Sequence, residues 1–196
     1  MLEVARTCHT AGMAKIYESI SGKLRDFIER QRVFFVATAP LSADAHINLS
    51  PKGLPGTFCI LDDQSLAYLD LTGSGVETIA HLRENGRICV MFCAFEGPPR
   101  IVRVHGTGHV IEPDDEEFGS LIDKFDSYAG VRSIIVIRAN RISDSCGYGV
   151  PLYEHKGERE QLQKWAEHKG PEGIAEYQRD KNAQSIDGIP SSLGKP

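Results

Sequence analysis

The sequence predicts a mainly β protein in which a small barrel is flanked by helices. Two observations support this class. Six or seven short segments are rich in β-branched and aromatic residues and are bounded by turn residues, as strands are. Two or three segments between them repeat apolar residues at helical spacing. The 196 residues suffice for one domain with a sizeable core, or for one domain with terminal extensions.

The predicted strands either alternate in polarity or are continuously apolar. The clearest spans 100–111, where Val102 and Val104 fall on one face and Arg103 on the other. Gly106 inside it predicts a bulge, a bend or a closely approaching ligand. The predicted strands are 33–38, 46–50, 57–61, 65–71, 87–95, 100–111 and 133–137.

Helical spacing predicts an amphipathic helix over 14–31 and a second helix over 74–84, which follows a glycine-rich turn. A third helix begins at Asp114, with acidic residues at its positive end. The segment 158–181 is polar and helix-prone, and its large apolar anchors are Trp165 and Tyr177.

These patterns divide the chain into four regions. We expect a flexible N-terminus over 1–12 and one barrel domain over 13–155. A helical extension over 156–185 and a disordered tail over 186–196 complete the prediction. No repeat or low-complexity block interrupts this order.

Composition argues against two classes of partner. The net charge of −5 disfavours nucleic acid, because binding phosphates requires clustered Lys and Arg. No apolar run approaches the roughly 20 residues needed to span a bilayer. The N-terminus lacks the pattern of a secretory signal, so we expect a cytoplasmic protein.

The cysteines and histidines do not predict a metal centre. Five cysteines at irregular spacing fit reduced thiols better than a disulfide framework. Cys89 and Cys93 lie four apart in an apolar run, where we interpret them as small core residues. His105 and His109 share a strand face, but no carboxylate or thiol partner is evident from the sequence, so no metal ligands are assigned.

The segment Ser50-Pro51-Lys52-Gly53 is the best candidate for binding an anion. A lysine between a proline and a glycine predicts a tight loop with one fixed cation. The Ser50 hydroxyl adds a donor, and both groups suit a phosphate. The alternative is that Lys52 is simply an exposed turn lysine.

A second candidate is the turn Thr72-Gly73-Ser74-Gly75, which opens the helix predicted over 74–84. Amides at a helix N-terminus attract anions, so Thr72, Ser74, Gly75 and Thr78 are candidate phosphate ligands. Alternatively, Thr72 or Ser74 caps the helix, and Glu77 is the acid of a capping box.

Taken in order, these motifs resemble the pyridoxamine 5′-phosphate oxidase-like flavoproteins, and the resemblance covers roughly residues 14–155. It is carried by Ser50-Pro51-Lys52-Gly53, Tyr68-Leu69-Asp70, Thr72-Gly73-Ser74-Gly75, the strand 87–95, Arg103-Val104-His105-Gly106 and the run Ser145-Cys146-Gly147-Tyr148-Gly149-Val150-Pro151. The resemblance implies an antiparallel, six-stranded, FMN-binding split β-barrel. It also implies a homodimer with FMN at the interface, acting as an FMN-dependent oxidoreductase on a small redox substrate.

Two departures separate this chain from the true oxidases. Their helix after the fourth strand opens with a basic pair that grips the FMN phosphate, whereas this chain has Gly75-Val76-Glu77-Thr78 there. Their C-terminal Arg-x-His element is also missing, since the run here is His155-Lys156-Gly157-Glu158-Arg159. Pyridoxamine phosphate is therefore not the expected substrate.

The remaining cofactor candidates have alternatives of their own. Arg103 could reach the phosphate, the ribityl chain or a substrate acid, or form a surface or dimer salt bridge. Tyr68 and Asp70 share a strand face and could line the flavin, although Tyr68 could equally be a core residue. Gly53 is a further cofactor candidate, as the last residue of the Ser50-Pro51-Lys52-Gly53 motif. No catalytic residue is assigned.

Other functions remain open at this point. A non-catalytic carrier or sensor could hold flavin or haem, with His105, His109 or His155 as axial ligand. A deazaflavin cofactor or a dimeric scaffold without a ligand are further alternatives.

Overall fold

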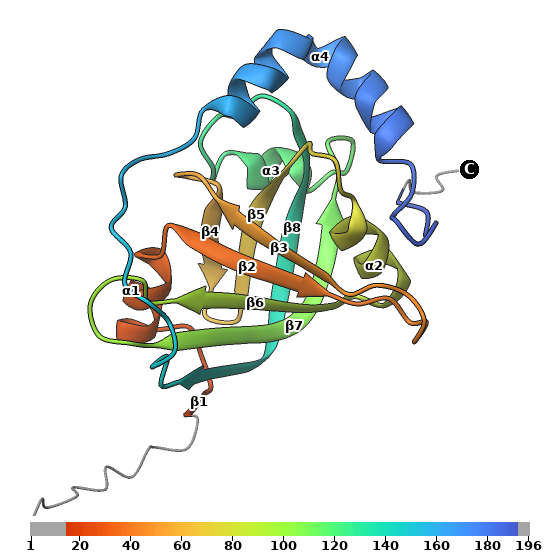
Figure 1. Ribbon diagram of the computed structural model, residues 1–196. Helices are drawn as coiled ribbons and strands as arrows, with labels where there is room; N and C mark the ends of the chain where they lie inside the picture. Colours follow the sequence, from red (N-terminus) through yellow and green to blue (C-terminus); the bar gives the residue numbers. More distant parts are fainter. Residues whose placement is uncertain (1–14, 192–196) are drawn as a thin grey trace, which may run out of the picture.

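The computed structural model describes residues 15–191 (Figure 1). The chain runs through β1 (Ile16–Tyr17), α1 (Gly22–Glu29), β2 (Val33–Thr38), β3 (Asn48–Gly53), β4 (Phe58–Asp62), β5 (Ser65–Leu71), α2 (Glu77–Asn85), β6 (Arg87–Cys93), β7 (Ile101–Ile111), α3 (Phe118–Ile122), β8 (Val131–Ser145) and α4 (Gln161–Lys181).

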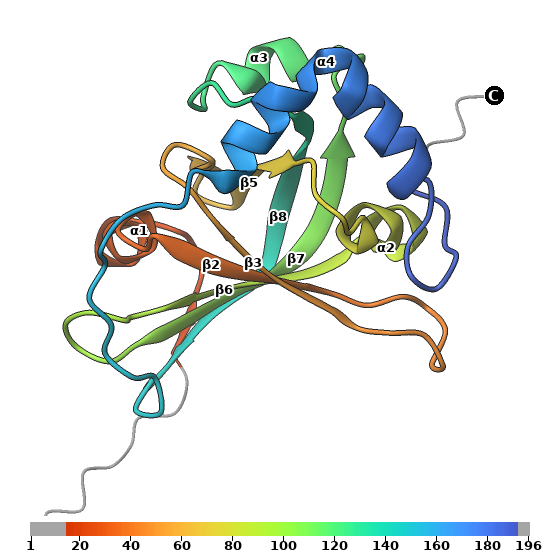
Figure 2. The same ribbon diagram turned by 45° about the horizontal axis from the view of Figure 1, so that its top comes forward.

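One antiparallel sheet forms the body of the molecule. Its strand order is β3-β2-β6-β7-β8-β5-β4, and the short β1 pairs with β8. The sheet curls into a half-barrel because the long strands β7 and β8 run through both of its halves (Figures 1 and 2). The predicted class, mainly antiparallel β with flanking helices, is confirmed. The main path holds seven strands in the described chain, within the six or seven predicted from the sequence pattern and one more than the resemblance implied.

Apolar side chains fill the concave side of the sheet. Phe34 lies at the centre, and its ring centroid is 5.2 Å from that of Phe58, 5.5 Å from that of Tyr68 and 5.9 Å from that of Phe92. These contacts join strands from the two ends of the strand order, so ring packing helps to hold the curled sheet together. A smaller cluster, including the buried Leu69, lies between the other face of β5 and β8 and the region of α3.

Two predicted elements have different bounds in the structure. The helix expected over 14–31 begins only at Gly22, because Ile16 and Tyr17 pair with Ser143 and Ile142 of β8. Tertiary pairing therefore overrides the helical pattern at its N-terminal end. The strand expected over 133–137 is the central part of β8, which is 15 residues long.

The prediction that Pro51-Lys52-Gly53 forms a loop is wrong. These residues form the second half of β3, where Lys52 pairs with Phe34 and Gly53 with Val33. Proline lacks an N–H for the ladder, but β3 lies at the edge of the sheet, where a proline is tolerated. The Lys52 side chain is therefore positioned by a strand.

The C-terminal part of the chain arches over the half-barrel. Helix α4 bends at Gly170, which has a left-handed φ of 65° just before Pro171, and descends beside α2 (Figure 2). Residues 186–191, expected as part of a disordered tail, instead form a turn closed by a bridge between Gln184 and Pro190. The expectations for 1–12 and 192–196 fall on residues that the structure does not describe.

Within residues 15–191, no helix combines the length and apolar character needed to cross a membrane.

Replacing Gly106 by alanine should destabilise the fold. A Cβ at this position would lie 2.2 Å from the carbonyl oxygen of Arg138, at a bulge between β7 and β8, and backbone cannot easily move away. We expect Gly106→Ala to lower the free energy of unfolding by about 2 kcal/mol. Urea denaturation followed by circular dichroism measures this.

The matched control is Gly119→Ala in α3, where a Cβ would meet no atom within 4 Å. Alanine favours helix over glycine, so this variant should be as stable as the wild type or slightly more stable. Equal urea midpoints for Gly106→Ala and the wild type would contradict the close approach of β7 and β8.

Candidate functional site

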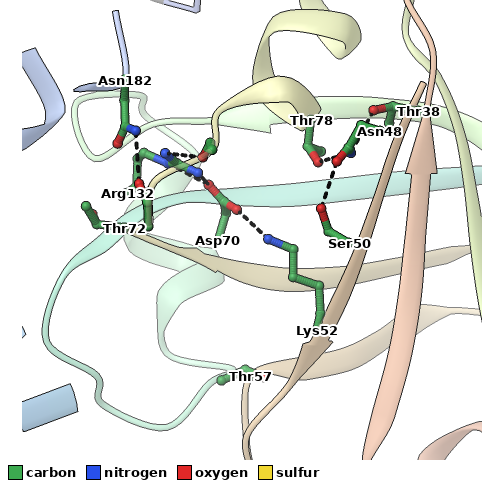
Figure 3. Close-up of polar contacts among 12 residues, drawn as sticks. Thr38, Asn48, Ser50, Lys52, Thr57, Asp70, Thr72, Thr78, Arg132 and Asn182 are labelled. Atoms are coloured by element: carbon green, nitrogen blue, oxygen red, sulfur yellow. Dashed lines mark hydrogen bonds and ion pairs between the residues drawn. The ribbon is translucent and has the colours of Figure 1, made fainter. Parts of the chain in front are cut away.

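A buried carboxylate with two cations lies where β3, β5 and β8 approach one another (Figure 3). Asp70 is 0% exposed, and its Oδ1 is 3.2 Å from Lys52 Nζ. Its Oδ2 accepts a hydrogen bond from Arg132 Nε at 2.8 Å and lies 2.7 Å from an Arg132 Nη2. We call Lys52, Asp70 and Arg132 the charged cluster.

The two cations keep Asp70 ionised. Burial alone would raise the pKa of Asp70, but the neighbouring Arg132 and Lys52 outweigh burial and hold this pKa below its usual value. With Asp70 ionised and both partners protonated, the charged cluster carries one net positive charge, so it can attract an anion.

A bulge between β5 and β8 brings Arg132 into the cluster. Asp70 pairs with Ser133, whereas the next residue of β5, Leu71, pairs with Val131, so Arg132 is the extra residue of the bulge. Its guanidinium also donates from Nη1 to the carbonyl oxygen of Gly75 at 3.1 Å. This bond connects β8 to the glycine-rich turn.

The charged cluster faces a small cavity of about 140 Å³. Its walls hold both cations, two hydroxyl side chains, the glycine-rich turn and one further carboxylate: Lys52, Arg132, Ser50, Thr78, Gly73, Gly75 and Glu77, with Asp70 and Leu71 completing the lining. Four of these residues are phosphate ligands predicted from the sequence, and the structure brings them together: Ser50, Lys52, Gly75 and Thr78.

A chain of polar side chains leads from the cavity to a buried histidine. Ser50 Oγ donates to Asn48 Oδ1 at 2.8 Å, and Asn48 Nδ2 lies 3.0 Å from Thr78 Oγ1 and 3.1 Å from Thr38 Oγ1. Thr38 Oγ1 is in turn 3.0 Å from His81 Nδ1. Burial lowers the pKa of His81, which favours the neutral imidazole at pH 7. Ser50 and Thr78 are thus held in fixed positions.

The glycine-rich turn does not cap α2 through Thr72 or Ser74, as the alternative interpretation of the sequence expected. Helix α2 begins at Glu77, and the residue in the cap position is Val76, which makes no side-chain capping bond. Thr72 is buried and donates instead to the carbonyl oxygen of Gly130 at 2.8 Å, while Ser74 is exposed. Neither hydroxyl caps α2.

Tyr68 and Arg103 do not line the cavity, although Lys52 Nζ lies 5.8 Å from the centroid of the Tyr68 ring. Tyr68 is 0% exposed within the aromatic core, so its ring does not line an open site. Arg103 lies on the opposite face of the sheet from Lys52. It belongs to the cross-strand row of Phe35 and Met91, whereas Lys52 pairs with the neighbouring Phe34. Its Nη1 donates to Ser145 Oγ at 3.1 Å.

Gly53 is at the end of β3, close to the backbone of the preceding connection. A Cβ there would lie 3.0 Å from the carbonyl oxygen of Arg32, and the carbonyl of Gly53 accepts from Thr57 Oγ1 at 2.8 Å. Gly53 therefore supports β3 and does not line the cavity.

Sequence reasoning missed four side chains that shape this region: Asn48, Arg132, Gln178 and Asn182. Arg132 directly precedes the strand predicted over 133–137, but only the bulge turns it towards Asp70. Gln178 and Asn182 lie more than 100 residues along the chain from the turn they contact, which no local pattern indicates.

The described cysteines, histidines and acids offer no metal centre. Over residues 15–191, no three of them gather where they could hold an ion. Cys59, Cys89, Cys93 and Cys146 are free thiols, and burial raises the pKa of the first three.

Asp70→Asn should destabilise the protein, because it leaves the largely buried Arg132 and the partly buried Lys52 without their carboxylate. We expect a loss of about 3 kcal/mol at pH 7 in urea denaturation. The folded pKa of Asp70 is depressed, so its contribution is present above its unfolded pKa of about 4 and is lost as pH falls through the folded pKa. The gap between wild type and variant should therefore narrow below about pH 4.

The control is Asp63→Asn in the exposed turn between β4 and β5, which should change stability by less than about 0.5 kcal/mol. If Asp70→Asn and Asp63→Asn unfolded at the same urea concentration as the wild type, Asp70 would not be holding the two cations.

Comparison with known proteins adds an independent line of evidence. The family model described as pyridoxamine 5′-phosphate oxidase matches residues 20–146, more than half of the chain. The pyridoxamine 5′-phosphate oxidase family protein ustO of Aspergillus flavus is 43% identical over 194 residues, which covers 91% of this chain and 78% of that protein.

Solved structures resemble this chain more weakly. HupZ of Group A Streptococcus is 22% identical, with a TM-score of 0.48, and the match covers 63% of this chain and 91% of HupZ. An FMN-binding protein from Syntrophomonas wolfei is 14% identical, with a TM-score of 0.45 and coverage of 61% and 86%. The family match and the identity to ustO show that this chain belongs to the pyridoxamine 5′-phosphate oxidase family.

Proposed function

We propose that the protein is an FMN-dependent oxidoreductase and that Lys52 and Arg132 hold the FMN phosphate. The observation that carries this proposal is the charged cluster, where two cations from different strands face one cavity. Family membership supports a flavin as the ligand. The cavity of about 140 Å³ suits the phosphate end of the cofactor alone, so the ring would lie outside it.

The donor set fits a phosphate. Lys52 has three N–H donors and uses one on Asp70, and Arg132 has five and uses three on Asp70 and Gly75. Both cations therefore keep donors for a further anion. The hydroxyl groups of Ser50 and Thr78 line the same cavity. The true oxidases carry a basic pair at the start of the helix that corresponds to α2. In this chain Arg132 of β8 takes the place of that pair.

Asp70 limits how strongly an anion is held. Its carboxylate already neutralises one of the two positive charges, and Glu77 on the cavity wall adds a second negative charge. A bound phosphate would gain charge-assisted hydrogen bonds at fixed positions. The net positive charge around it would be small. We therefore expect moderate affinity for FMN.

The cofactor, when bound, supplies hydride transfer, and the protein supplies binding and orientation. Lys52 and Arg132 bind the phosphate end, and the chain of Ser50, Asn48 and Thr78 fixes the polar wall beside it. Arg103 faces the other side of the sheet, where it is available to a second subunit.

We propose that this second subunit is another copy of the chain, docked on the outer face of β3, β2, β6 and β7. Cross-strand rows on this face join Pro51, Phe35, Met91 and Arg103, and next to them Leu49, Ala37, Cys89 and His105. None of these eight side chains is buried, and Leu49 is 64% exposed. A largely apolar face of this kind is typical of interfaces between subunits.

Removing either cation should weaken FMN binding. We expect Arg132→Ala and Lys52→Ala each to raise the Kd for FMN about tenfold, because each loses a charge-assisted hydrogen bond worth roughly 1.5 kcal/mol. Quenching of FMN fluorescence in a titration measures the Kd. The control Lys23→Ala, an exposed cation in α1, should leave it unchanged.

A protein that is colourless and does not quench added FMN would contradict the proposal. Unchanged affinity in both cation variants would show that the phosphate binds elsewhere. A Soret band after addition of haem, lost in His105→Ala, would instead favour a haem carrier.

The dimer should depend on Leu49. In size-exclusion chromatography with light scattering, we expect the wild type to have about twice the 21.6 kDa of one chain. Leu49→Lys places a charge on the interface, so it should shift the mass towards one chain. Leu162→Lys, on the exposed side of α4, should not. If the wild-type protein had the mass of a single chain at micromolar concentration, the dimer would be ruled out.

A further inference from the structure

The end of α4 and the turn after it lie against the candidate site. We call residues 178–191 the C-terminal strap. Figure 2 shows α4 arching over the half-barrel, so that the strap comes down beside α2 and near the hairpin between β2 and β3. The strap lies outside residues 20–146, the part matched by the family model.

Two strap side chains hold the glycine-rich turn. Gln178 Nε2 donates to Thr72 Oγ1 at 2.8 Å. Asn182 Nδ2 donates to the carbonyl oxygen of Gly73 at 3.0 Å (Figure 3). Thr72 is 1% exposed and Asn182 is 5% exposed, whereas Gln178 and Gly73 are half-buried, so both bonds are partly shielded from water. Both bonds favour the observed conformation of the turn, because breaking either one leaves a polar group without its partner.

Two further contacts reach α2 and the hairpin. The backbone N–H of Ile186 donates to Glu77 Oε1 at 3.3 Å, which engages the carboxylate on the cavity wall. Asp187 Oδ2 accepts from the backbone N–H of His46 at 2.9 Å, and its Oδ1 is 2.7 Å from His46 Nδ1. Within residues 15–191, the side-chain hydrogen bonds between the strap and residues before α4 are those to the glycine-rich turn, α2 and the hairpin.

The contacts place the strap behind the cavity wall that faces Lys52 and Arg132. Gly73, Gly75 and Glu77 belong to that wall, and the strap contacts Gly73 and Glu77 directly. Gly75 is connected from the other side, because its carbonyl accepts from Arg132. The wall therefore has a support on each side, one from β8 and one from the strap.

We propose that the C-terminal strap positions the anion site and that Asn182 is its main positioning residue. Gly73 has no side chain to limit its backbone, and a Cβ there would meet no atom within 4 Å, so no side-chain packing at Gly73 restrains this part of the turn. The bond from Asn182 restrains the Gly73 carbonyl, between the bonds that hold Thr72 and Gly75. This inference rests on the proposed function, in that the anion is the FMN phosphate.

The test uses Asn182→Asp in the full chain. Aspartate keeps the shape of asparagine and replaces the donor nitrogen by an oxygen, so the bond to the Gly73 carbonyl is lost. Two measurements are made: amide hydrogen exchange of residues 72–78 without any ligand, and the Kd for FMN. We expect faster exchange at 72–78 and a Kd raised about fivefold, as for the loss of one hydrogen bond.

Two matched controls isolate the effect. Gln184→Ala lies in the strap and is exposed, and Asp180→Asn tests an exposed acid at the end of α4. Neither should change exchange at 72–78 or the Kd. Asn182→Ala should behave like Asn182→Asp, which separates loss of the donor from the added negative charge.

Unchanged exchange at 72–78 in Asn182→Asp would overturn the inference while leaving FMN binding intact. Faster exchange with an unchanged Kd would also overturn it, because the strap would then serve stability alone. A wild type that binds no FMN would overturn the proposed function and this inference together, and the titration of the wild type alone identifies that case.

Discussion

The buried carboxylate of Asp70 is the interaction on which the rest of this structure depends. In the strand order, β3 is at one end and β5 is next to the other, so no backbone ladder joins them. The ion pair between Lys52 and Asp70 crosses this gap, as do the aromatic contacts of Phe34 with Phe58 and Tyr68. The curled sheet is therefore closed by side chains, apolar in the core and charged at the cavity.

The same cluster links fold and function. A buried carboxylate is costly unless it is paired, so Asp70 fixes where Lys52 and Arg132 must lie. Once fixed, both cations present their remaining donors to one cavity. The strand β8 supplies Arg132, and the C-terminal strap supports the opposite wall through Asn182. Under the proposed function, binding of a phosphate depends on the contacts that hold the two ends of the sheet together.

Much of this could be predicted from the sequence. Alternation and β-branched runs located most strands, and the resemblance of the motifs identified the family that the comparisons show. Lys52, Asp70 and Thr78 were selected as site residues, and they do line one cavity. Local patterns failed where tertiary contacts decide. The pairing of Ile16 with β8 shortens the first helix, and the bulge at Arg132 is a property of two paired strands. Arg103 was grouped with Lys52, but the register of the sheet places it on the other face.

The proposed function requires that Lys52 and Arg132 form a phosphate site for a flavin. A comparison of FMN with riboflavin, which lacks the phosphate, tests it most directly. Two charge-assisted hydrogen bonds predict that the wild type binds FMN about a hundredfold more tightly than riboflavin, with the difference shrinking as salt is added. Equal affinity for the two flavins at low salt would contradict the account.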